Sequence, residues 1–161
     1  MSICFFKRYR MQCDLDECFP DVEPSPAGYQ FQPWRRELLN AHAEAKFRSF
    51  RNELDCNVFP SLGDADGCLR LMREIASRRS FVPEATWLLT KQDPASQRVE
   101  NVGTIQGIRE QKDVGSIQNI GIATQHRGQR LGTALLRHSL AGFRSAGVRY
   151  VTLEVTGHNT G

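Results

Sequence analysis

The segment from Ile120 to Leu136 constrains the fold more than any other part of the chain. It begins as an apolar strand, passes through a short polar turn and continues as an amphipathic helix, expected over 128–146. One narrow arc of this helix is basic and polar, while leucines and Phe143 fill the remainder, so the helix should pack against a sheet. Another alternating strand follows Gly147. A strand, helix and strand in this order form a right-handed crossover, which makes the two strands parallel.

The remaining patterns complete a layered fold. Apolar residues at helical spacing predict helices over 35–54 and 64–77, joined by a loop. Alternating segments at 85–90, 102–109 and 114–123 are separated by polar turns and predict an antiparallel meander. The predicted fold class is therefore α+β in three layers, with a mixed, mostly antiparallel central sheet and helices on both faces.

The first 28 residues are expected to lie outside this core. Alternation over 5–15 predicts a half-buried strand, added at the edge of the sheet. The Pro-rich segment 16–28 is typical of a surface loop, and a short strand is expected at 29–34. We therefore divide the chain into an extra strand with a Pro-rich loop, 1–28, and a main domain, 29–161.

Composition narrows the function classes. The 161 residues suit one domain, and 40% apolar with 24% charged residues is ordinary for a soluble globular protein. The net charge of +3 comes from scattered basic residues without a stripe, so we expect no nucleic-acid partner. No run approaches the roughly 20 apolar residues of a membrane span. The five cysteines form no C-x-x-C pair or metal-ligand spacing, so we expect reduced thiols, a cytoplasmic location and no metal.

The turn between the strand and the long helix suits an anionic phosphate. The first turn of a helix presents N–H groups without an internal partner, and the helix dipole adds partial positive charge there. Gly128 and Gly132 would let the main chain approach a bulky diphosphate, and Arg127 and Arg130 add charge nearby. The sequence therefore predicts an anion cradle built largely from backbone.

The strand before this cradle carries an irregularity. Ile117 belongs to one face of the strand, whereas Ile120 and Ile122 belong to the other, because the alternation slips by one residue. A period of two can slip only where an extra residue is inserted. We therefore predict a β-bulge near Gln118 and Asn119.

Six consecutive residues resemble the acyl-CoA-binding motif of the GNAT superfamily, usually written R/Q-x-x-G-x-G/A. They are Arg127, Gly128, Gln129, Arg130, Leu131 and Gly132. Arg130 stands where the family commonly has the middle glycine, and we expect it in an ordinary helical conformation with its side chain turned outward. The order of elements over 29–161 also resembles the family, in which the bulge opens a slot for the pantetheine arm. The resemblance implies a GNAT-like acyl-CoA N-acyltransferase fold that stops before the family's last helix and closing strands.

The resemblance also implies an activity. An acetyl group would pass from acetyl-CoA, the acyl-donor substrate, to a small-molecule or peptide amine by direct attack in a ternary complex. A non-catalytic acyl-CoA-binding module or an inactive fragment is the alternative, and a homodimer stays open. By analogy with the family, contacts to the cofactor fall to the strand end, the motif and a later asparagine. They are Ile122, Ala123, Thr124, Arg127, Gly128, Gln129, Arg130, Leu131, Gly132, Thr133 and Asn159.

Other polar residues are weighed as catalytic or acceptor-binding groups. Glu154, on the last strand, is the candidate to take a proton from the attacking amine, and a solvated position on an edge strand is the alternative. His126 is either a cofactor contact or a polar turn residue. His42, Glu53 and Asp55 lie on or after the first helix and would either bind a cationic acceptor or be solvated at the surface.

Overall fold

The computed structural model describes residues 7–18, 21–22 and 24–157. Within these residues, six strands form one mixed sheet in the order β1-β6-β5-β4-β3-β2. The strands are β1 (Arg8–Asp14), β2 (Tyr29–Pro33), β3 (Phe81–Gln92), β4 (Val99–Gln111), β5 (Val114–Ile122) and β6 (Tyr150–Thr156). The helices are α1 (Leu39–Phe50), α2 (Asp55–Val58), α3 (Ala65–Ser77) and α4 (Leu131–Ser145), with 3-10 turns at Arg36–Leu38, Pro60–Gly63 and Thr124–His126.

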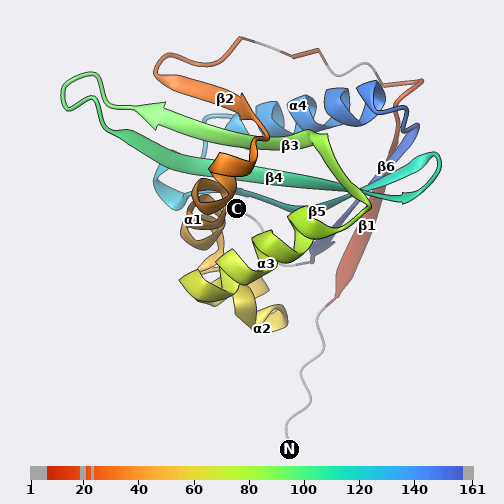
Figure 1. The fold of residues 1–161 in the computed structure, drawn as a ribbon, viewed down its shortest axis with the longest axis horizontal. Helices are drawn as coiled ribbons and strands as arrows, with labels where there is room; N and C mark the ends of the chain where they lie inside the picture. Colours follow the sequence, from red (N-terminus) through yellow and green to blue (C-terminus); the bar gives the residue numbers. More distant parts are fainter. Residues whose placement is uncertain (1–6, 19–20, 23, 158–161) are drawn as a thin grey trace, which may run out of the picture.

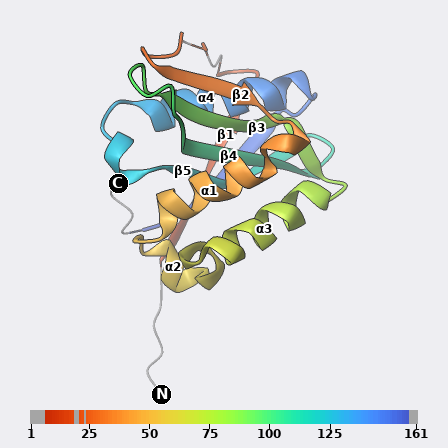
Figure 2. The ribbon, with the colours of Figure 1, turned by 60° about the vertical axis from the view of Figure 1, so that its left-hand side comes forward.

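Helices cover both faces of the sheet (Figure 1). Helices α1 and α3 lie side by side on one face, seen in Figure 2, and α4 crosses the other. Strands β3, β4 and β5 form the predicted antiparallel meander, and β6 runs parallel to β5 after the crossover through α4. The predicted α+β fold class is therefore confirmed. None of the helices in the described ranges is long and apolar enough to cross a membrane.

The main apolar core lies between the sheet and α4. Leu131, Leu135 and Phe143 on α4 are buried and belong to one cluster with Val102 and Ile105 on β4. Burying each such side chain contributes roughly 1.5–3 kcal/mol. The amphipathic pattern predicted for this helix is confirmed, although the helix begins three residues later than expected.

Several predicted boundaries are corrected. The segment between the first two long helices was expected to be a loop, but it contains α2 and the turn Pro60–Gly63. The strands of the hairpin between β3 and β4 are longer than predicted and its turn is shorter, because the polar residues Lys91 and Glu100 at its tip still pair across the ladder. Alternation is a weak signal at such an exposed tip, where both faces are polar.

Strand β1 lies at one edge of the sheet, antiparallel to β6. The predicted half-burial is wrong for the first part of β1, since Tyr9 and Met11 are 47% and 49% exposed. Within the described residues 7–15 only Leu15, just after the strand, is fully buried, and residues 5 and 6 of the predicted strand lie outside the described residues. The register places Tyr9 beside Val155, in the part of β6 that no longer pairs with β5. This half of β1 therefore pairs with β6 beyond the point where β5 and β6 stop pairing with each other.

Gly142 sets the close crossing of α4 over β3. A Cβ atom there would lie 1.8 Å from the carbonyl oxygen of Glu84, so Gly142→Ala must push the helix away from the sheet. We expect the variant to lose about 3 kcal/mol of unfolding free energy in urea denaturation. The exposed Ser145→Ala on the same helix is the control and should change by less than about 0.5 kcal/mol. Equal stability of the two variants would contradict this packing.

Candidate functional site

Strands β5 and β6 separate partway along their length. Residues 114–117 of β5 pair with residues 150–153 of β6, and the pairing ends there. At the same point the register between β4 and β5 shifts by one, which leaves Gln118 as an inserted residue. The bulge predicted near Gln118 and Asn119 is therefore confirmed, and it coincides with the opening between the strands.

The separated strands border a cavity of about 810 Å³. Its walls are the bulged half of β5, the end of β6, the start of α4, and the residues that follow α1. Most of the candidate residues meet here. Those that line it are Glu53, Asp55, Ile122, His126, Arg127, Gly128, Arg130, Leu131, Gly132, Thr133 and Glu154. Ala123, Thr124 and Gln129 are not among the lining residues, and Asn159 lies outside the described residues.

The first turn of α4 faces this cavity. Its N-cap residue, Arg130, makes no capping hydrogen bond through its side chain within the described part of the chain. At α3, by contrast, the Asp64 carboxylate accepts hydrogen bonds from two backbone N–H groups. Apart from its chain neighbours and the backbone of its own helix, a Cβ atom on Gly132 would have Cγ1 of Ile122 as its nearest atom, at 3.8 Å. The N–H groups of this turn and the space in front of them therefore suit an anion.

Two residues of the turn into α4 have a left-handed backbone. Gly128 has φ +77°, and Arg130 has φ 59° and ψ 15°. The ordinary helical conformation expected for Arg130 is therefore wrong. An L-residue in this region costs roughly 1–2 kcal/mol relative to the right-handed form, whereas glycine adopts it freely. The sequence did carry a signal for this conformation. The family commonly has glycine at the place of Arg130, and glycine is typical of positions where the main chain is left-handed.

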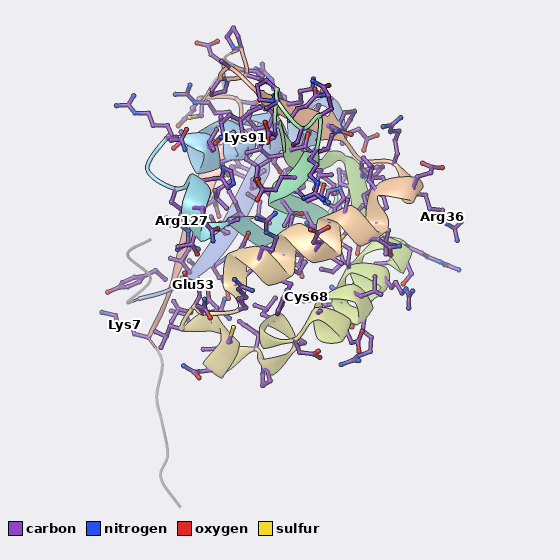
Figure 3. All side chains as sticks on the ribbon, turned by 90° about the vertical axis from the view of Figure 1, so that its left-hand side faces the viewer. Lys7, Arg36, Glu53, Cys68, Lys91 and Arg127 are labelled. Atoms are coloured by element: carbon purple, nitrogen blue, oxygen red, sulfur yellow. The ribbon has the colours of Figure 1, made fainter. Side chains whose placement is uncertain are left out.

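Arg127 ties this turn to the end of α1 (Figure 3). Its Nη1 donates to Oε1 of Glu53 at 2.6 Å, its Nη2 to the Ser49 carbonyl oxygen at 2.9 Å, and its Nε to the Ile122 carbonyl oxygen at 3.0 Å. The Arg127 and Glu53 side chains are 27% and 22% exposed, so their pair is partly shielded from water. The guanidinium group therefore holds the strand end, the turn and α1 together.

His126 lies in the 3-10 turn Thr124–His126, as the interpretation of a polar turn residue has it, but it is buried and also lines the cavity. Its Nδ1 lies 2.9 Å from the hydroxyl of Tyr29, and its Nε2 lies 3.3 Å from Oε2 of Glu100. The Arg48 guanidinium, followed by the smaller influence of His126, holds the pKa of the Glu100 carboxyl below its usual range. His126 thus anchors the turn before the cradle to β2 and β4.

A buried polar cluster, which the sequence analysis missed, lies between α1 and the sheet. Lys46 is fully buried, and its Nζ donates to Oε1 of Gln106 and Oδ1 of Asn119, both at 2.6 Å. His42, one helical turn earlier, is also fully buried, with Nδ1 2.8 Å from Oγ1 of Thr104. Burial lowers the pKa of Lys46 to about 7. Burial, aided by the charge of Lys46, lowers the pKa of His42 to about 3.

This cluster corrects the expected orientation of α1. The apolar spacing predicts an apolar buried face, and Ala43 and Phe50 are buried, but His42, Lys46 and Ser49 share that face. His42 is therefore neither solvated at the surface nor placed to bind an acceptor. Reasoning from helix faces assigns Lys and His to solvent, and only polar residues at matching positions of the strands could have indicated otherwise.

Carboxylates border the cavity on the side of α2 and β6. The Glu154 side chain is 54% exposed and lies 3.6 Å from Nη2 of Arg8 on β1. Oδ1 of Asp55 accepts a hydrogen bond from the hydroxyl of Thr156 at 2.7 Å. Both line the cavity, so an acceptor entering there would meet negative charge.

A sheet that splits at a bulge, with an open helix N-terminus beside the split, is the architecture of acyl-CoA N-acyltransferases. A family model described as the Acetyltransferase (GNAT) family matches residues 9–161. The chain belongs to this family. A comparison with curated proteins finds no match.

Solved structures share the fold at low sequence identity. A GCN5-related N-acetyltransferase from Sphaerobacter thermophilus is 22% identical, with a TM-score of 0.65 over 97% of this chain and 46% of that one. A GNAT family acetyltransferase from Brucella melitensis, in complex with acetyl-CoA, is 15% identical, with a TM-score of 0.54 over 78% and 74%. The ribosomal-protein-S18-alanine N-acetyltransferase from Escherichia coli is 17% identical, with a TM-score of 0.53 over 82% and 70%. The chain thus spans less than half the length of the Sphaerobacter protein.

The left-handed conformation of Arg130 predicts a stabilising substitution. Arg130→Gly should raise the unfolding free energy by up to about 1 kcal/mol, because relief of the Cβ contact exceeds the added chain entropy. Gln129→Gly is the matched control, since Gln129 has no positive φ, and it should lower stability instead. Urea denaturation of both variants checks this. A loss of stability in Arg130→Gly would show that the residue is not left-handed in solution.

Proposed function

We propose that this chain binds acetyl-CoA and transfers its acetyl group to an amine. The observation that carries the proposal is the separation of β5 from β6 at the bulge, directly beside the open start of α4. Membership in the GNAT acetyltransferase family supports acetyl-CoA as the donor. The Brucella relative, whose structure contains acetyl-CoA, supports the same assignment.

The proposed binding mode uses backbone more than side chains. The diphosphate would lie on the N–H groups of the turn from Gly128 to Thr133, with the exposed Arg130 adding charge. Main-chain groups of Ile122 and Thr124, at and just after the strand end, would pair with the amides of the pantetheine arm. Arg127 is engaged by Glu53, so its proposed part is to hold the turn in shape. Gln129 would contribute through its backbone.

The proposed reaction is direct attack in a ternary complex. The amine first loses its extra proton to solvent, and its neutral nitrogen attacks the thioester carbonyl carbon. The tetrahedral adduct collapses with cleavage of the C–S bond, and CoA leaves as a thiolate that takes up a proton from solvent. The proton that the nitrogen loses on attack passes to the Glu154 carboxylate, directly or through water. Orientation in the cavity supplies most of the remaining acceleration.

The acceptor is proposed to be a small molecule or peptide that carries an amine. The carboxylates of Asp55, Glu110 and Glu154 line the cavity, and they would attract an amine that arrives protonated. A non-catalytic acyl-CoA-binding module is the second candidate. The ion pair of Glu154 with Arg8 favours it, because that carboxylate already has a partner.

The cradle is tested by Gly132→Asp. The helix N-terminus tolerates a carboxylate, and a Cβ atom has room there, so the fold should keep its stability. The same carboxylate would repel a diphosphate, and we expect acetyl-CoA affinity in titration calorimetry to fall at least tenfold, about 1.4 kcal/mol. Gly132→Ala, which adds the Cβ without charge, is the control and should bind far better. Unchanged affinity in Gly132→Asp would place the diphosphate elsewhere.

The catalytic part is tested by Glu154→Gln. If Glu154 takes the amine proton, kcat for thiol release should fall about 100-fold while the dissociation constant for acetyl-CoA stays the same. Glu110→Gln, another carboxylate at the cavity, serves as the control. Thiol release from wild type should require both substrates. Release with acetyl-CoA alone, or full activity of Glu154→Gln, would contradict the assignment, and tight binding without turnover over a broad amine panel would favour the non-catalytic module.

A further inference from the structure

Lys46 and Asn119 meet where the slot opens. Asn119 belongs to the bulge of β5, is half-buried and lines the cavity. Lys46 approaches it from α1 and is fully buried, with Nζ 2.6 Å from Oδ1 of Asn119. A buried cation and an amide that reaches the cavity are therefore in direct contact.

This contact fixes which end of the Asn119 amide faces the cavity. Nζ of Lys46 donates this hydrogen bond, so Asn119 turns its carbonyl oxygen toward Lys46. Its Nδ2 then points away from Lys46. Over the described ranges Nδ2 has no hydrogen bond to the chain. It is also not among the buried polar atoms that lack a partner, so it is accessible to solvent. The free N–H groups of Asn119 are thus available from the cavity.

The rest of the cluster holds Lys46 in place. Gln106 accepts from Lys46 and donates through Nε2 to the hydroxyl of Thr104, which contacts His42. The other titratable groups facing Lys46 are His42 on α1 and Cys68 on α3. Desolvation raises the pKa of the Cys68 thiol to about 11, so this group stays neutral. In the described part of the chain no carboxylate pairs with Lys46, and its charge therefore acts on the two amides.

A buried lysine without a carboxylate partner lowers the stability of a protein, because burial removes the hydration of its charge. The place of Lys46 beside the bulge indicates which function this loss of stability could serve. The six residues from Thr124 back to Asn119, at the end of β5 and just after it, would span about 17 Å if fully extended, and a pantetheine arm laid along them from the cradle brings its thioester toward the bulge. A donor placed there meets the carbonyl oxygen on which negative charge develops during attack.

We infer that Lys46 is a positioning residue that holds the side-chain amide of Asn119 as a hydrogen-bond donor to the thioester carbonyl oxygen of acetyl-CoA. The inference rests on the proposed acetyl-transfer function. The hydrogen bond from Nζ to Oδ1 polarises the amide, and it strengthens the N–H donors of Asn119 most when Lys46 is protonated. Asn119 would touch the substrate, whereas Lys46 would act only through Asn119.

The test compares Asn119→Asp with wild type. The new carboxylate keeps an ion pair with Lys46, so the variant should fold, but it presents no donor to the cavity. We expect kcat to fall roughly 100-fold, as for loss of one oxyanion donor. Acetyl-CoA affinity should fall about tenfold, while affinity for CoA, which lacks the carbonyl, should stay within about threefold of wild type.

A double-mutant cycle separates positioning from simple structural support. Lys46→Met should also lower kcat, and Lys46→Met with Asn119→Asp should be no slower than Asn119→Asp alone, because Lys46 acts through Asn119. Additive losses, or a kcat within about threefold of wild type in Asn119→Asp, would overturn the inference. If Lys46→Met does not fold, the acetyl-CoA to CoA affinity ratio of Asn119→Asp decides alone. Failure of wild type to bind acetyl-CoA would instead overturn the proposed function.

Discussion

The single inserted residue at Gln118 is the constraint on which the rest of the site depends. Without it, β5 would keep its register and could continue its ladder with β6 beyond residue 117. With it, the strands diverge, and backbone groups that would be paired inside a sheet face a cavity instead. The start of α4 lies at the same opening, so an anion site and a backbone slot arise from one irregularity of the sheet.

The opened sheet needs support where its ladder is interrupted. Two polar contacts supply it. Lys46 on α1 bonds Asn119 at the bulge, and Arg127 joins Ser49 on α1 and Glu53 just after it to the end of β5. The Lys46 contact is buried and the Arg127 contact is partly shielded from water, which makes them stronger than surface pairs and more costly to leave unsatisfied. Helix α1 therefore shapes the cavity as well as covering the sheet.

The sequence was informative wherever a pattern repeated along one element. The α4 stripe and the bulge follow from the spacing of apolar residues within a single segment, and the antiparallel meander and the parallel crossover follow from the order of such segments along the chain. The polar interior could not be predicted in this way. Lys46, His42, Gln106 and Asn119 come from three elements, and only the fold shows that they meet. The conformation of Arg130 was mispredicted for a different reason, since one left-handed residue leaves no periodic trace.

The central claim is that backbone amides at the start of α4 bind the diphosphate of CoA. A titration of the ¹⁵N-labelled protein with CoA, followed by amide NMR, tests it most directly. The account predicts that the largest shifts fall on Leu131, Gly132 and Thr133, with further shifts along the bulged half of β5. Saturable binding that leaves these amides unchanged and shifts a different surface would contradict it.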